Sequence, residues 1–309
     1  VLTEGLSVAY TTPSTLGDSV KTAFDQTAFF ALRSQPLFEM VADVRSTNQS
    51  HNGSGVQFTF YADMSQATSA LTENSDVSAV ALTDSAVTVT LAEYGNAVIT
   101  TAKVRGTSFL NVDSDAANII GYNMADSLDK IVSDVANGGT NVNYSGGAAN
   151  RGALTTGDEY TAADGRKAVA QLRSRNAPGW ENGNYMGIIH PDVSYDLRSD
   201  TTVTDVIQYQ VQQDGQAIRA GSIGTFNGIM YILIADGGAT TFDAYQTLIC
   251  GRQGLAKAFS RAAGFGPEPS IVVGPVVDSL RRFNPVGWYH LVGYGRFRED
   301  SLQRVESIS

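Results

Sequence analysis

The residues of this chain that could perform chemistry are few, and their surroundings favour structural roles. His51 lies in a polar segment, His190 follows the apolar run MGII, and His290 stands within the apolar run GWYHLVG. A hydrolase needs a nucleophile beside an imidazole and an acid that orients it. No serine occupies a Gly-x-Ser-x-Gly elbow, and the carboxylates Glu299 and Asp300 lie in a charged run that we expect to be solvated. We therefore predict no catalytic residue and no enzymatic activity, with a hydrolase as the less favoured alternative.

Metal and cofactor sites are also not indicated. Cys250 ends the apolar run YQTLIC, which is typical of a small buried side chain. No two histidines, nor a histidine and the cysteine, have the spacing of a metal site. The glycines Gly221, Gly224 and Gly228 match neither the dinucleotide pattern nor the lysine-bearing phosphate loop. The prediction is no metal, no cofactor and no cofactor-binding residue.

The tripeptide His190-Pro191-Asp192 also occurs in chaperone J-domains, in a loop between two antiparallel helices. The flanking helices of a J-domain do not have their expected sequences here. Residues 186–189 indicate a short apolar strand that Pro191 ends, and residues 194–198 indicate a helical turn. We interpret the tripeptide as a corner in the fold.

The composition indicates a globular protein of mixed α+β class. Apolar residues make up 42% of the 309 and charged residues 17%, with 31 glycines, which favours strands, turns and long loops. The formal charge of −10 comes without a basic block, which argues against tight binding of DNA or RNA. We expect no disulfide within the chain, no secretion signal and no membrane span.

The first fifty residues have no apolar partner nearby in the sequence. Residues 18–45 offer a short helical pattern, broken at Pro36, with Phe24, Ala28 and Leu32 on one stripe. Two interpretations stay open. The segment is either a helix docked at the edge of a domain or an arm that completes its burial on a neighbouring subunit.

A long hairpin is predicted next. Residues 55–65 and 84–95 both alternate apolar and polar side chains with the period of half-buried strands. The connection between them, residues 62–83, is polar, rich in small residues and too long for a tight turn. Structureless connections of this length are usually functional, so we expect it to contact another molecule.

The strongest helical signal covers residues 113–137, where Asp113 or Ser114 can cap the first turn. Its apolar stripe is Ile120, Met124, Leu128, Ile131 and Val135. At 1.5 Å per residue this helix is roughly 36 Å long.

A second helix is predicted to start at the capping box formed by Thr161 and Asp164 and to end before Pro178. The segment between the helices, residues 138–157, is interpreted as a glycine-rich linker. Further strands are expected at residues 229–234, 288–297 and 302–305.

The order of these elements resembles the major capsid proteins of tailed bacteriophages, and within them the branch of the coliphage N-four capsid protein. The resemblance spans nearly the whole chain and depends on order and spacing, since no single motif is specific. Its motifs are the LAEYG end of the hairpin, His190-Pro191, Asp196-Leu197-Arg198, Gly221 to Gly228, Val286-Gly287-Trp288 and Tyr294-Gly295.

The resemblance implies the Hong Kong 97-type shell fold of the α+β class. Its parts would be an N-terminal arm (1–50), an extended loop (51–105), a peripheral domain with the spine helix (106–180), an axial domain (181–265) and a return to the peripheral domain (266–309). The implied function is a major capsid protein that self-assembles, as hexamers and pentamers, into the icosahedral head around a double-stranded DNA genome. An encapsulin-like bacterial nanocompartment shell is the alternative.

The implied partners are further copies of the chain and scaffolding, portal and cement or decoration proteins, with only weak nonspecific contact to packaged DNA and no membrane. The implied location is the virion, after assembly in the bacterial host cytoplasm. The founding phage of this fold crosslinks its subunits through a lysine on the extended loop. Here residues 53–101 contain no lysine, and Lys103 stands at the base of the hairpin. We therefore expect a shell held by non-covalent contacts.

Overall fold

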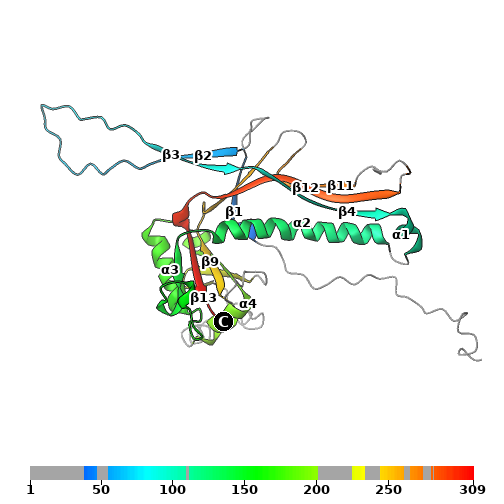
Figure 1. Ribbon diagram of the computed structural model, residues 1–309. Coiled ribbons are helices and arrows are strands. Elements are labelled where there is room, and N and C mark those ends of the chain that lie inside the picture. The colour runs from blue at the N-terminus through cyan, green and yellow to red at the C-terminus, as the bar shows by residue number, and fades with distance from the viewer. Residues whose placement is uncertain are drawn as a thin grey trace, which may run out of the picture.

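The computed structural model describes residues 38–46, 55–108, 111–200, 225–233, 244–260, 265–273, 280 and 282–309. Within them the chain forms a five-stranded sheet, a six-stranded sheet and a two-stranded hairpin, accompanied by helices (Figure 1). The α+β class is therefore confirmed. The apolar stripe expected at Phe24, Ala28 and Leu32, together with Gly221 and Gly224, lies outside the described residues.

The five-stranded sheet is organised around one long strand, β12. β12 pairs antiparallel with β4, β10 and β11, while β1 adds to β10 in parallel. The strands are β1 (Ala42–Ser46), β4 (Ala92–Thr101), β10 (Leu255–Phe259), β11 (Ser270–Val273) and β12 (Phe283–Arg296). β12 begins five residues before the expected Trp288, because β4 pairs with it from Phe283 onward.

Gly287 explains how β4 and β12 approach each other. A Cβ atom built there would lie 2.8 Å from the Cβ of Ala97 and 2.9 Å from the carbonyl oxygen of Asn96. No larger residue fits without moving a strand, so the glycine in the Val286-Gly287-Trp288 motif is required by close backbone approach.

The long helix α2 (Val112–Asn137) runs along this sheet (Figure 1), as the sequence predicted. Its cap was predicted wrongly: the Asn111 side chain accepts the Ser114 N–H at 3.5 Å. Asp113 instead accepts the hydroxyl of Thr100 at 2.8 Å.

The buried stripe of α2 also differs from the prediction at its C-terminal end. Ile131 and Val135 are half-buried, and the buried apolar residues are Ala116, Ile120, Leu128, Val132 and Ala136. Ile120 and Leu128 pack with Trp288 and Val292 of β12. Val132 and Ala136 belong to another cluster, with residues of η1 (Phe38–Val41) and β9 (Tyr245–Cys250). The helix packs on β12 along one part and on η1 and β9 along another, so different sides of the helix are buried along its length.

The six-stranded sheet has the strand order β5-β13-β9-β6-β8-β7. Its remaining strands are β5 (Val142–Tyr144), β6 (Tyr185–Ile189), β7 (Thr225–Phe226), β8 (Ile229–Leu233) and β13 (Leu302–Ser307). Helices α3 (Ala162–Ser174) and α4 (Pro191–Ser199) share its core, which includes Leu172, Leu197, Ile229 and Ile249. The capping box of Thr161 and Asp164 and the end of α3 before Pro178 are confirmed.

Two interpretations of this region need correction. Residues 138–157 are more than a linker, because β5 pairs in parallel with β13 and two 3₁₀ turns follow it, η2 (Ser145–Gly147) and η3 (Arg151–Ala153). Helix α4 begins directly at Pro191, three residues earlier than predicted. Proline is favoured at a first helical position, and the His190 Nδ1 accepts the Asp192 N–H at 3.2 Å as the cap.

The predicted hairpin is present as β2 (Gly55–Tyr61) paired with β3 (Asp84–Thr90). Its root packs on the body through Val56, Phe58 and Val89, which contact Ala258 and Phe297. The connection, residues 62–83, forms no helix or strand and every residue in it is exposed. Figure 1 shows it reaching well beyond the rest of the described fold. Short helical segments complete the chain at α1 (Ala102–Thr107), η4 (Glu181–Gly183) and η5 (Glu299–Ser301).

The two sheets do not follow the expected domain ranges. β5 and α3, from the range 106–180, and β13, from the range 266–309, lie with the six-stranded sheet, whereas β10, from the range 181–265, lies in the other. β4 belongs to the five-stranded sheet, although its residues fall in the loop range 51–105. The peripheral and axial assignments therefore stay a prediction. Among the described residues, no helix is long and apolar enough to cross a bilayer.

Candidate assembly surfaces

The histidines and the cysteine do not meet in the described part of the chain. Cys250 is buried, its thiol donates to the Met186 carbonyl at 3.4 Å, and burial raises its pKa to about 12. His290 is buried too, and burial together with nearby Lys257 lowers its pKa to about 4. His190 caps α4, and His51 lies outside the described residues. A thiol held neutral is a poor nucleophile, so Cys250 is better suited to packing than to chemistry.

No group of three or more histidine, cysteine or acidic side chains that could hold a metal occurs in the ranges that the structure describes. The Glu299 carboxylate is partly exposed, and it also makes contacts that were not predicted. It pairs with Arg296 at 2.8 Å and accepts the Thr140 N–H at 2.7 Å. Asp300 is exposed, as expected.

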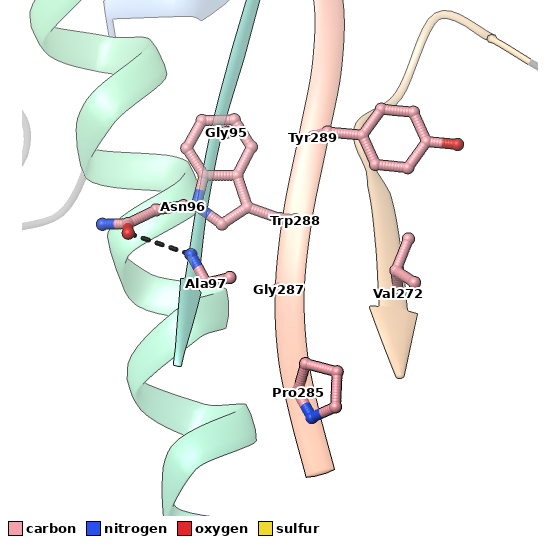
Figure 2. Close-up of a pocket in the computed structure, with 8 residues that line it drawn as sticks. All are labelled: Gly95, Asn96, Ala97, Val272, Pro285, Gly287, Trp288 and Tyr289. Atoms are coloured by element: carbon pink, nitrogen blue, oxygen red, sulfur yellow. Dashed lines mark hydrogen bonds between the residues drawn. The ribbon is translucent and has the colours of Figure 1, made fainter. Parts of the chain in front are cut away.

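A groove of about 590 Å³ lies on the five-stranded sheet between β4, β12 and β11. It is lined by Gly95, Asn96, Ala97, Val272, Pro285, Gly287, Trp288 and Tyr289. Figure 2 shows Trp288 and Asn96 on the side of α2 and Tyr289 over β11. The Asn96 amide is used structurally, since its oxygen accepts the Ala97 N–H at 2.9 Å and its nitrogen donates to Asn123. The lining contains no ionisable acid, base or nucleophile apart from one tyrosine, so it is not built for catalysis.

The most exposed apolar surface is the tip of the hairpin. Its large apolar side chains are 57–77% exposed and consist of Tyr61, Met64, Leu71, Val77, Val80 and Leu82. Soluble monomers rarely present so many apolar side chains on one projecting segment, and such surfaces usually mark interaction sites.

The charge of the hairpin is of one sign. Residues 46–102 contain no lysine or arginine. The acidic residues Asp63, Glu73, Asp76 and Asp84 lie in its exposed portion. A surface that is both apolar and anionic favours a partner surface with apolar contacts and positive charge.

A second apolar surface lies where β4 meets the start of α2. Val98 and Ile119 are exposed there and line a depression of about 220 Å³. Ile99 and Val104 nearby in the chain are exposed too, and so are Ile271 and Val273 of β11 on the opposite edge of β12. This surface was not predicted, although the run AVIT in residues 97–100 was the signal that a strand continues there.

The profile of the family described as Phage capsid protein matches residues 13–302. The chain belongs to this family. A search of curated proteins by sequence gives no match for the capsid protein.

Solved capsids have the same fold as this capsid protein. The capsid of Ralstonia phage GP4 has a TM-score of 0.73 at 14% identity and covers 99% of this chain and 98% of that one. The head of Helicobacter pylori bacteriophage KHP40 has a TM-score of 0.74 at 12% identity, with 98% and 99% covered. The capsid of Cyanophage P-SCSP1u has a TM-score of 0.71 at 18% identity, with 95% and 94% covered.

These matches confirm the Hong Kong 97-like fold and the identification as a bacteriophage capsid protein. The capsid protein is a structural protein of the shell and not an enzyme.

Proposed function

We propose that this protein is the major subunit of a tailed-phage head, with hexamers and pentamers of the chain closing an icosahedral shell around double-stranded DNA. One observation carries the proposal: the hairpin extends its apolar tip, residues 62–83, into solvent with no intramolecular partner in the described chain. Apolar side chains of this kind lower the free energy of the system only when another surface covers them and removes them from water. Contacts between unlike surfaces of identical copies close into rings when their rotation permits it.

The parts of the chain take different roles in this proposal. The residues before η1 (Phe38–Val41) are the arm. The β2–β3 hairpin is the extended loop, the five-stranded sheet with α2 is the peripheral domain, and the six-stranded sheet with α3 and α4 is the axial domain. We place the chain in the branch of the coliphage N-four capsid protein on its sequence motifs.

The same proposal extends to partners and location. The chain assembles in the bacterial host cytoplasm, with scaffolding, portal and cement or decoration proteins, and ends in the virion. Contact with the packaged DNA is weak and nonspecific, because a chain of formal charge −10 offers few phosphate contacts.

The test is microscopy of the purified chain, alone and with its scaffold, for hollow icosahedra. The informative variant changes Leu71, Val77 and Val80 to serine. It should leave circular dichroism unchanged, since these side chains touch no core, and abolish closed shells. A matched control changes Thr68, Ser69 and Ser78 in the same loop to alanine and should assemble normally. A wild-type chain that stays monomeric under all assembly conditions would contradict the proposal.

We also propose that the shell is held without covalent crosslinks. The expectation that Lys103 stands at the base of the hairpin was wrong, because the ten-residue strand β4 separates them and Lys103 lies on α1. Lys130 pairs with Asp134, and Lys257 is buried. An isopeptide bond requires a lysine amine held against a carboxamide in a dry site, and the hairpin offers no amine. Mature particles boiled in denaturant should release the chain at 32.8 kDa on a gel. A ladder of oligomers that resists reductant would overturn this part alone.

A further inference from the structure

The described chain begins at a short segment that is tied to two different parts of the body. Phe38 and Val41 of η1 are buried against Val132 and Ala136 of α2. Directly after them, β1 pairs in parallel with β10, with Ala42 opposite Leu255. Residues 38–46 therefore join the long helix to the five-stranded sheet.

Three polar groups hold this segment in place. The backbone N–H of Phe38 donates to Oδ1 of Asp129 on α2 at 2.6 Å. The carboxylate of Glu39 pairs with the ammonium of Lys257 on β10. The hydroxyl of Tyr294 on β12 donates to the same Glu39 oxygen at 3.0 Å.

The burial of the ion pair is unequal. The Lys257 side chain is only 9% exposed, whereas the Glu39 side chain is 39% exposed. Neutralising Glu39 with the segment in place would leave a covered ammonium without its counter-charge, which is strongly destabilising. Neutralising Lys257 would leave a carboxylate that still reaches water.

We propose that Lys257, Glu39 and Asp129 are positioning residues that form an anchor, which holds residues 38–46 on the body. Asp129 joins the segment to α2, and Tyr294 joins it to β12. The consequence of the anchor for shells rests on the proposed function, whereas the anchoring itself concerns the unassembled chain.

The asymmetry of the pair provides the test, by hydrogen exchange on the full unassembled chain. Glu39→Gln leaves a buried ammonium without its counter-charge and should speed exchange in residues 38–46 by about tenfold or more. Exchange in α3, residues 162–174, should not change. Lys257→Met leaves a carboxylate that can reach water and should have the smaller effect.

The double variant, Glu39→Gln with Lys257→Met, should bring exchange in residues 38–46 back to within about threefold of wild type. If Glu39→Gln alone prevents folding, recovery of the fold in the double variant supports the anchor just as well. Unchanged exchange in Glu39→Gln, equal acceleration in every element, or a double variant no better than Glu39→Gln would each overturn the proposal. Because no variant is read out by assembly, failure here leaves the shell function untouched.

Two deletions test the anchor independently. Removing residues 1–41 takes away Glu39 and the buried side chains of Phe38 and Val41. It should therefore lower the unfolding midpoint of the body clearly further than removing residues 1–37 does. Equal midpoints for the two deletions would contradict the anchor.

Discussion

The β2–β3 hairpin and the helix α2 differ in where their apolar side chains find partners. Along α2, buried residues recur from Ala116 to Ala136, and those from Ile120 onward include apolar side chains that pack with strands or η1. Along the hairpin, burial stops after Phe58, and residues 61–83 are all exposed. Both α2 and the β2–β3 pair are regular secondary structure, so the difference lies in the neighbours that the rest of the chain supplies. The hairpin extends beyond the core of its own chain, and we expect another molecule to contact its exposed part.

The charges of the two regions follow the same division. The body buries ionised groups in pairs, such as Glu306 with Arg151. The charged residues of the hairpin tip are all acidic and exposed. Substitutions in the body should therefore change the free energy of unfolding, and substitutions in the tip should change assembly.

The largest effect on stability is expected at Glu306, whose side chain is 0% exposed and accepts two bonds from Arg151, at 2.5 and 2.6 Å. Arg304 lies 2.8 Å from the same carboxylate. Glu306→Gln should cost about 3 kcal/mol, the lower end of the range for a broken buried pair, because Arg151 remains partly solvated. The measurement is denaturant unfolding of the unassembled chain. Glu73→Gln in the tip is the control and should change stability by less than about 0.5 kcal/mol. Equally small changes in unfolding free energy for Glu306→Gln and Glu73→Gln would contradict the difference drawn here between the body and the tip.

A pair of leucines compares the two regions with the same substitution. Leu128 of α2 is 3% exposed and Leu71 of the tip is 77% exposed. Leu128→Ala should cost about 2–3 kcal/mol through lost burial and a cavity. Leu71→Ala should leave the unfolding free energy within about 0.5 kcal/mol of wild type and reduce the yield of shells. A large loss of stability in Leu71→Ala would mean that the tip packs on its own chain.

The pH dependence of the body should reveal His290. Its pKa lies near 4, below the ordinary value of 6.5, because burial and Lys257 oppose protonation while Glu39 favours it. His290 therefore binds a proton more readily in the unfolded chain than in the folded one. The free energy of unfolding is unaffected by His290 above about pH 6.5 and falls as the pH drops from 6.5 toward 4. The total is on the order of 3 kcal/mol. His290→Gln should flatten this part of the stability profile. An unchanged slope between pH 6.5 and 4 would assign the dependence to other groups.

The sequence predicted the fold best where the local structure is determined by residues close together in the chain. The capping box at Thr161, the strand period of β2 and β3, and the length of α2 are such cases. The signals failed where a distant partner decides. β5 becomes a strand because β13 pairs with it, and the face of α2 near Val132 is set by η1.

The candidate surfaces divide in the same way. That residues 62–83 connect two strands without regular structure was predicted from their length and composition, whereas their exposed apolar side chains were not. The anchor at Glu39 was not predicted either, because it joins residues more than two hundred positions apart in the chain, and a lone lysine in the run LAKAF gives no sign of its partner. The apolar surface where β4 meets the start of α2 was missed, because β4 could not be recognised as a strand without its partner β12.

Cysteine labelling at the hairpin tip tests the central claim, that copies of the chain cover this tip in the shell, most directly. The native Cys250 is buried and its pKa is raised to about 12, so it should stay unreactive in the folded chain. A thiol introduced by Leu71→Cys should react with a maleimide at the rate of a free thiol in the unassembled chain. In closed shells we predict that labelling of the same thiol falls by about a hundredfold or more, as expected for a group that neighbouring copies cover. Equal labelling rates before and after assembly would contradict the account.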